Sequence, residues 1–316
     1  MELFKRNPLA LLIKVLLLAA VFTVIQYAIT SKIMPTYYQM TLTTLCLNII
    51  LAVSLNLING FTGQLSLGHA GFMSIGAYVS VVFIDKLNTP FIFGLFMACL
   101  AAAIAGLLIG MPTLRLRGDY LAIATLGFGE IIRIILYNIE YVGGAAGITG
   151  IPKITTWPWL FGAVVLTVLV IQNLINSSYG RAIVSIREDE VASELMGINI
   201  ANYKILAFVV GAMFAGLAGS LYAHYFYVIK PSSFGFMKSF DVLVMVVLGG
   251  LGSTSGAVIA AIFVTILSTV LQSFPELRMV FYAIVLIVIM IFRPQGLMGN
   301  KELSLKILRR NREEDK

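Results

Sequence analysis

Long stretches of the chain carry no charged side chain, and these stretches determine the first prediction. Asp, Glu, Lys and Arg are absent from five runs: 33–84, 87–114, 154–180, 205–229 and 242–275. A helix that crosses the hydrocarbon core of a bilayer needs about 20 apolar residues. Backbone polar groups in lipid must be hydrogen-bonded within their own segment, so these runs are predicted to be helical.

The pattern predicts an all-α integral membrane protein with about ten transmembrane helices. The predicted spans are 9–31, 38–58, 64–84, 90–111, 119–138, 158–176, 204–228, 237–251, 255–273 and 279–293. The first is interpreted as a membrane helix and not as a removable signal peptide, because no small-residue cleavage site follows its apolar run. Residues 1–300 are expected to form one transmembrane domain, followed by a charged cytosolic tail, 301–316.

The distribution of Lys and Arg predicts the orientation. If the N-terminus is cytoplasmic, the inner segments hold 15 Lys and Arg residues and the outer loops hold 6, among them Lys238. Short cytoplasmic loops carry an excess of Lys and Arg, so both termini are expected on the cytoplasmic side. The net charge of +7 follows this topology, and no nucleic-acid partner is expected.

Composition excludes several other classes of protein. Hydrophobic residues make up 59% of the chain and charged residues 12%, whereas a soluble domain carries about 25% charge. Cys46 and Cys99 both lie in apolar runs, which favours packing over a disulfide or a metal site. The phosphate-binding spacing G-x-x-x-x-G-K-[ST] is absent from the sequence, so any ATP would be bound by a separate chain and no cofactor is expected in this one.

The segment 177–203 is too polar to enter lipid. Asp189 is placed to cap a short helix from Glu190 to Met196, and Gly197 can end that helix in the left-handed conformation. Asn199 can start the next helix. A short capped helix between two spans is typical of a docking element, and a solvated loop without a partner is the alternative. The residues expected to face a partner are Arg187, Glu188, Asp189, Glu190, Ala192, Glu194 and Gly197.

Glycine and other small residues indicate close packing. Gly211, Ala215 and Gly219 form one stripe at helical spacing, and Ala212, Gly216 and Ser220 form a second beside it. Two such stripes predict that the helix 204–228 has neighbours on both sides. The outer loop 139–157 is rich in glycine, which permits positive φ and tight turns, so this loop is expected to be compact.

Several blocks of sequence, in order, resemble one known family. Ser177–Lys204 and its continuation AFVVGAMFAGLAGSLYAH resemble the branched-chain amino acid ABC permease family, in particular its LivM-type subunits. Five further blocks are similar to the family in the same way, namely SLNLINGFTGQLSLGHAGFMSIGAY, GDYLAIATLGFGEIIR, GGAAGITGIP, VLGGLGSTSGAVIAA and FRPQGLMG. The general permease signature, Glu-Ala-Ala followed after three residues by Gly, is incomplete, because Val191 stands at the position of its Glu.

The resemblance implies the type II importer architecture, with the coupling helix of the ATP-binding subunits in the segment 177–203. It also implies four kinds of partner: a second, LivH-like permease subunit, two cytosolic ATP-binding subunits, an extracytoplasmic solute-binding protein and membrane lipid. The implied solutes are Leu, Ile and Val, in a bacterial or archaeal plasma membrane. Urea permeases share these blocks and are the rival interpretation.

Polar residues inside the predicted spans are candidates for the transport path. This group precedes or opens the third span: Asn56, Asn59, Gln64, Ser66 and His69. Polar groups and glycine at membrane depth often line a cavity or a broken helix, and interhelical hydrogen bonding is the alternative. Glu130 and Arg133, one turn apart, are expected to form a structural ion pair. An ion-coupled secondary transporter would need a buried acidic site, and Glu130 is the mid-span acid that the pattern offers.

Overall fold

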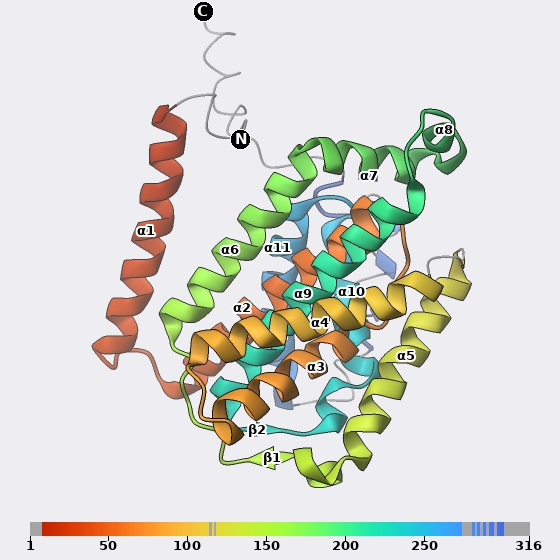
Figure 1. Cartoon of the computed structure of the whole chain (residues 1–316). Helices are drawn as coiled ribbons and strands as arrows, with labels where there is room; N and C mark the ends of the chain where they lie inside the picture. Colours follow the sequence, from red (N-terminus) through yellow and green to blue (C-terminus); the bar gives the residue numbers. More distant parts are fainter. Residues whose placement is uncertain are drawn as a thin grey trace, which may run out of the picture.

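The computed structural model describes residues 8–113, 116 and 118–273, with scattered positions between 280 and 299, and it describes side chains from residue 16 onward. Helices dominate this part of the chain (Figure 1). They are α1 Pro8–Thr30, α2 Thr36–Asn56, α3 His69–Val81, α4 Phe91–Thr113, α5 Asp119–Asn138, α6 Trp157–Asn176, α7 Ser178–Glu188, α8 Glu190–Leu195, α9 Ile200–Phe226, α10 Phe236–Gly249 and α11 Thr254–Val270.

Six helical segments are long and apolar enough to cross a membrane, by length and composition: 36–61, 91–113, 119–138, 157–176, 200–226 and 231–249. The described part of α1 and the whole of α11 are shorter apolar helices. These elements match eight of the predicted spans. The tenth predicted span, 279–293, is described only at scattered positions, and the tail 301–316 lies outside the described residues.

The third predicted span, 64–84, differs from the observed structure. α2 continues through a π-helical turn, Leu57–Phe61, and the chain then runs without helix until α3 begins at His69. α3 passes into a second π-helical turn that ends at Lys86. The helix therefore starts five residues later than predicted, because the side chains of Asn59 and Thr125 bond to Ser66 and Leu67 in place of helical backbone partners.

α9 and α2 form the centre of the bundle, and α9 packs most extensively against α3 and α4. A Cβ atom added at Gly219 would lie 1.9 Å from the carbonyl oxygen of Met73 in α3, and one added at Gly216 would lie 2.5 Å from the Cβ of Ala102 in α4. The two stripes of small residues thus contact two different helices, as predicted.

The loop between α5 and α6 and the loop after α9 are joined by a short antiparallel sheet. β1, Ile148–Thr149, pairs with β2, Val228–Ile229. Positive φ angles at Gly143, Gly144, Gly147 and Gly150 confirm the predicted compact loop. This sheet lies at the end of the bundle opposite α7 and α8 (Figure 1).

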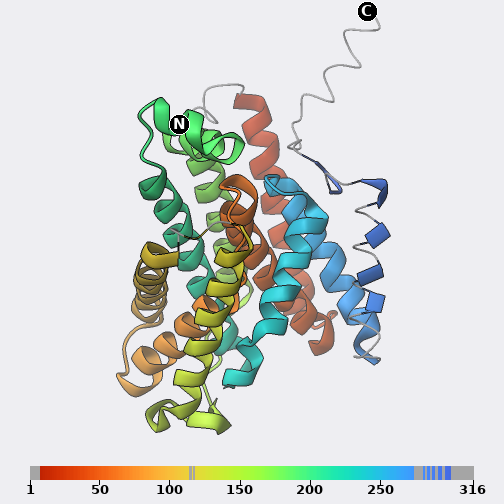
Figure 2. The same ribbon diagram turned by 90° about the vertical axis from the view of Figure 1, so that its right-hand side faces the viewer.

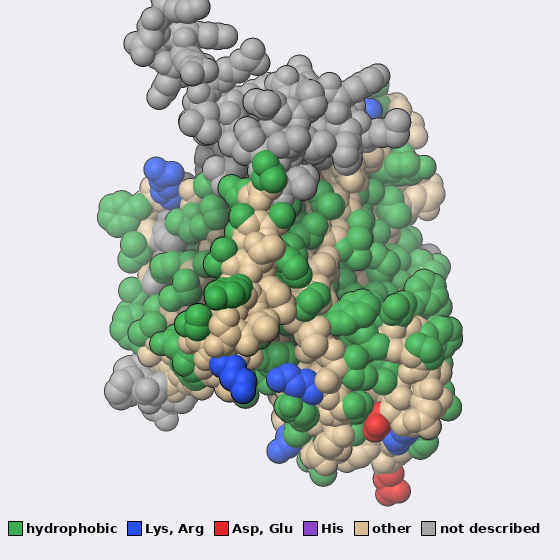
Figure 3. Space-filling model, turned by 90° about the vertical axis from the view of Figure 1, so that its left-hand side faces the viewer, with side chains coloured by type: hydrophobic (Ala, Val, Ile, Leu, Met, Phe, Trp, Pro, Cys, Tyr) green, Lys and Arg blue, Asp and Glu red, His purple; other side chains and the backbone are tan. Residues whose placement is uncertain are grey.

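Apolar side chains cover the described surface between the two ends. The face drawn in Figure 3 has a central band without charged side chains, and its Lys, Arg, Asp and Glu residues lie toward the ends. On α4, for example, Phe96 is 61% exposed and Leu108 is 65% exposed. Such a surface suits a lipid environment, and the chain is a multi-pass membrane protein.

Candidate functional site

A non-helical segment, residues 62–68, enters the bundle between the end of α2 and the start of α3. Asn59 in the π-helical turn holds it by two hydrogen bonds to one residue: its Nδ2 donates to the carbonyl oxygen of Ser66 at 3.3 Å, and its Oδ1 accepts from the Ser66 amide at 3.1 Å. Thr125 Oγ1 of α5 accepts from the Leu67 amide at 3.0 Å. Side chains therefore replace the backbone partners that a continuous helix would supply.

The first turn of α3 is bonded to neighbouring helices. The Oγ of Ser239 in α10 accepts from the amide of Ala70 at 3.0 Å, which satisfies one of the donors that a helix N-terminus leaves without a partner. The ring Nε2 of His69 lies 2.8 Å from the hydroxyl of Ser54, seven residues before the end of the helix 36–61. α3 therefore begins inside the bundle, about 10 Å below that end.

Three of the predicted path residues carry buried polar atoms that have no partner among the described residues. These atoms are Gln64 Nε2 and Oε1, Ser66 Oγ and His69 Nδ1. Leaving such an atom buried without a partner costs about 1–3 kcal/mol, so these atoms mark a place where the described chain leaves polar groups unsatisfied. A role of the segment in the transport path remains a prediction.

Asn56, the fourth predicted path residue, connects α2 to the loop between α10 and α11. Its Nδ2 donates to the carbonyl oxygen of Ser253 and its Oδ1 accepts from the amide of Gly252, both at 3.0 Å. Asn56 is completely buried. Asn56 thus holds the loop between α10 and α11, and Asn59 holds residues 62–68. These contacts are of the kind expected if the two residues serve hydrogen bonding within the bundle, the alternative to a role in the transport path.

The polar segment 177–203 contains two helices at one end of the bundle (Figure 1). The predicted caps of the second helix and of the start of α9 are confirmed. Asp189 Oδ1 accepts from the amides of Val191 and Ala192, Gly197 has φ +82°, and Asn199 Oδ1 accepts from the Asn202 amide. α7 was not predicted, although Ile183 and Ile186 give it a buried face.

Two ionic contacts tie this segment to the membrane helices. Lys204, near the start of α9, pairs with Glu190 of α8, and the lysine is buried whereas the glutamate is partly exposed. Arg187 Nη1 donates to the carbonyl oxygen of Gly60 at 3.0 Å, and its Nη2 lies 2.6 Å from Glu188 Oε1. Arg187 and Glu190, both expected to face a partner, therefore make contacts within the chain.

The exposed face of α8 is partly apolar. Leu195 and Met196 are each 83% exposed and Val191 is 65% exposed, beside the exposed Ala192 and Glu194. Reasoning from the sequence emphasised the charges and missed these three apolar residues. Val191 lies four residues before Leu195 and five before Met196. This spacing on one short helix was the signal in the sequence, since a helix this short has little core to contact.

Four charged residues lie within α5 and α10. The predicted ion pair is confirmed, with Arg133 Nε 2.6 Å from Glu130 Oε2, and Glu130 Oε1 also accepts from the amide of Phe236 at 3.1 Å. Lys238 was assigned to an outer loop, which is wrong. It lies in the first turn of α10, and its Nζ donates to Asn48 Oδ1 of α2 at 2.9 Å. Asp241 lies one turn further along α10.

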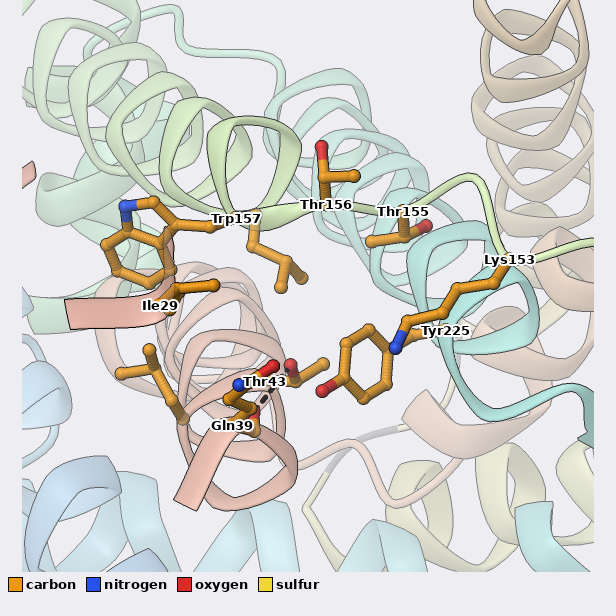
Figure 4. A pocket seen from close by; sticks show the side chains of 10 residues that line it. Ile29, Gln39, Thr43, Lys153, Thr155, Thr156, Trp157 and Tyr225 are labelled. Atoms are coloured by element: carbon orange, nitrogen blue, oxygen red, sulfur yellow. Dashed lines mark hydrogen bonds between the residues drawn. The ribbon is translucent and has the colours of Figure 1, made fainter. Parts of the chain in front are cut away.

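A cavity of about 200 Å³ lies at the opposite end of the bundle from α8, where α1, α2, α6 and α9 meet (Figure 4). Its wall includes Trp157, Tyr225 and Thr43. The ammonium of Lys153 lies 4.7 Å from the centre of the Tyr225 ring, a cation–π contact. Thr156 and Trp157 begin α6, so this cavity marks an end of the membrane helices and not their middle.

Comparison with solved structures shows the fold. PsaBC from Streptococcus pneumoniae, solved in complex with a Fab, matches 86% of this chain and 97% of its own chain with a TM-score of 0.50 and 15% sequence identity.

Comparison of sequences shows the family. The family model described as branched-chain amino acid transport system, permease component, matches residues 37–290. The high-affinity branched-chain amino acid transport system permease protein LivM of Escherichia coli K12 is 39% identical over 82% of this chain and 69% of its own. The LivH permease protein of the same organism is 27% identical over 81% of this chain and 92% of its own. This chain therefore belongs to the family of permease components of branched-chain amino acid transport systems.

Proposed function

We propose that the chain is the membrane-spanning subunit of an importer for Leu, Ile and Val, driven by ATP that separate subunits hydrolyse. The proposed assembly contains a second, LivH-like permease, two cytosolic ATP-binding subunits and an extracytoplasmic solute-binding protein. It resides in a bacterial or archaeal plasma membrane, with both termini of this chain in the cytoplasm. The chain itself binds no cofactor in this proposal, because ATP is bound by the partners.

The observation that carries this proposal is the form of α8. It is a short helix, capped at both ends, that stands outside the membrane-length helices and exposes Val191, Leu195 and Met196. Large apolar side chains exposed to water at one point are typical of an interaction site. The contacts of Arg187 and Glu190 with the membrane helices supply a route by which movement of a partner against α8 would reach the bundle.

The proposed mechanism is alternating access. Closure of the ATP-binding subunits would displace α7 and α8. ATP can bias the cycle only if these subunits contact the permease differently in its inward-open and outward-open states. Arg187 contacts the π-helical turn that precedes residues 62–68 and lies beside the loop at Gly252, so both interior segments would move with α7. The binding protein would deliver solute at the opposite end, near β1 and β2.

The other classes of transporter are less favoured. An ion-coupled transporter needs a titratable site at mid-membrane, and Glu130, the acid that the sequence offered for that role, accepts hydrogen bonds from both Arg133 and the Phe236 amide. Urea is the rival solute. The names of the relatives favour branched-chain amino acids, and these are therefore the proposed solutes.

Reconstitution tests the proposal. The chain is co-expressed with the neighbouring permease and ATPase genes, purified and placed in liposomes with the binding protein. We expect ATP-dependent uptake of L-leucine that exceeds uptake of urea, with ATP hydrolysis stimulated by the loaded binding protein. Replacement of Leu195 and Met196 by Ser is expected to reduce co-purification of the ATPase, whereas replacement of Leu166 by Ser on the apolar surface of α6 is not. Absence of any ATPase from the purified complex would contradict the proposal.

A further inference from the structure

The ammonium of Lys238 lies level with the middle of a membrane-length helix. Its partner Asn48 is the thirteenth residue of the 26-residue helical segment Thr36–Phe61, and Asn48 itself is only 5% exposed. At 1.5 Å per residue, Asn48 lies about 20 Å from either end of that segment. Asn48 Nδ2 in turn donates to Thr265 Oγ1 of α11 at 2.9 Å, so the ammonium of Lys238 reaches into a polar chain between three helices.

A second pair of charges lies on α5, which contacts α10. Glu130 and Arg133 lie in the second half of α5, and Glu130 bonds to Phe236, the first residue of α10. α5 and α10 lie side by side in Figure 2. Lys238 and Asp241 are one turn apart on α10 and so lie on one face of it. We call these four residues, Glu130, Arg133, Lys238 and Asp241, the α5–α10 charge cluster.

The cluster is only partly buried. The side chains of Glu130 and Arg133 are 29% and 32% exposed, and Lys238 and Asp241 are half-buried. A charged residue at the centre of a membrane helix costs about 2.5–3.5 kcal/mol when it faces lipid. The face drawn in Figure 3 avoids this cost with its charge-free central band. The face that carries the cluster is therefore expected to contact a partner subunit or water instead of lipid.

The cluster adjoins the broken helix. Thr125 of α5 bonds to Leu67, and Ser239 of α10, next to Lys238, bonds to Ala70. Residues 62–68 thus lie against both helices that carry the charges. Gln64 and Ser66 in this segment hold the buried polar atoms that lack partners in the described structure. Two independent features, half-buried charges within membrane helices and unsatisfied polar groups, therefore lie on neighbouring elements.

We propose that the α5–α10 charge cluster forms the wall of the transport path at mid-membrane and that it takes a small zwitterion. Two cations and two anions give the cluster no net charge. A free amino acid presents a carboxylate that Lys238 and Arg133 can bind and an ammonium that Asp241 and Glu130 can bind. Without solute, the charges are held by protein contacts such as Arg133–Glu130 and Lys238–Asn48. A neutral amide such as urea has no such charges to match.

This inference rests on the proposed function and specifies its solute. The test uses the complete reconstituted complex with Lys238→Gln and Asp241→Asn, and Asp119→Asn as control, because Asp119 is exposed in the first turn of α5 and lies outside the segments proposed to contact partners or solute. We expect at least a tenfold loss of L-leucine uptake in the first two variants, with co-purification and stimulated ATP hydrolysis kept within about twofold of the wild type. The control is expected to transport normally.

A second measurement tests access to water. Lys238→Cys is made in a chain whose Cys46 and Cys99 are replaced by Ala, and it is treated with a water-soluble thiol reagent in the complex. We expect labelling that L-leucine with the binding protein slows severalfold and that urea does not slow. Equal slowing by urea would refute the preference for a zwitterion.

The outcomes separate this inference from the proposed function. A wild-type complex without ATP-driven uptake would reject the function itself. Normal uptake by Lys238→Gln and Asp241→Asn in a working complex would overturn the inference alone, as would absence of labelling with and without ATP. If the neutral variants fail to assemble, the KM for L-leucine is measured with Lys238→Arg and Asp241→Glu instead. A path residue should change this KM, whereas a structural residue should leave it unchanged, which would overturn the inference.

Discussion

Asn56 provides a quantitative test of how the interior loops are held. The side chain is completely buried and bonds both to Gly252 N and to the carbonyl oxygen of Ser253, 196 and 197 residues away. Asn56→Ala leaves the Gly252 amide without its acceptor, which costs about 1–3 kcal/mol, and removes a second bond worth about 1 kcal/mol. Ser253 O still accepts from the Ala257 amide, so it is not left unpaired. The expected loss of unfolding free energy is about 2–4 kcal/mol.

The assay follows thermal unfolding in detergent with a fluorogenic thiol reagent, since Cys46 is only 4% exposed in the folded chain. A loss of 1 kcal/mol lowers Tm by about 2–4 °C in chains of comparable size, so Asn56→Ala should lower it by at least about 4 °C. Asn138→Ala is the matched control, because Asn138 is exposed and bonds only within its own helix, to Ile134 O. A Tm for Asn56→Ala that equals that of the control would refute the reasoning.

Three further predictions concern packing and coupling. Glu190→Gln should lower Tm more than Lys204→Gln. The first variant leaves a buried ammonium without its carboxylate, whereas the second leaves a glutamate that water can reach. Equal losses of Tm in thermal unfolding would contradict this. Gly219→Ala should sharply reduce the yield of folded protein in size-exclusion chromatography, since its Cβ would overlap α3, whereas Gly162→Ala, with nothing within 4 Å, should be neutral or slightly stabilising. Arg187→Lys should keep complex assembly but lower the amount of L-leucine transported per ATP. An ammonium cannot bond to Gly60 and Glu188 with the geometry of the guanidinium fork. An unchanged ratio of L-leucine to ATP would count against a role of Arg187 in coupling.

Features that depend on a few neighbouring residues were predictable from the sequence. The caps at Asp189, Gly197 and Asn199 are formed within three residues, and the Glu130–Arg133 pair spans one helical turn. The apolar runs predicted most of the membrane helices for the same reason, since a helix in lipid satisfies its own backbone. The two stripes of small residues on α9 predicted neighbours on both sides, although not which helices these would be.

Features that depend on distant partners were decided only by the tertiary structure. The prediction placed the start of the third span at residue 64, but Thr125 and Ser239 supply hydrogen bonds that allow the chain to remain non-helical up to His69. Hydropathy cannot reveal such partners, because it records the composition of a segment and not its surroundings.

The positions of the charges show the same division. The sequence by itself determined that the chain lies in a membrane and which polar segment stays outside it, because the cost of burying charge acts on each segment separately. Lys238 was assigned to an outer loop, yet it lies in the first turn of α10, where Asn48, 190 residues earlier, accepts its hydrogen bond. Arg187 likewise bonds to Gly60, 127 residues away. Which charges a membrane protein can hold in its interior depends on the partners that packing brings to them, and only the folded chain decides that.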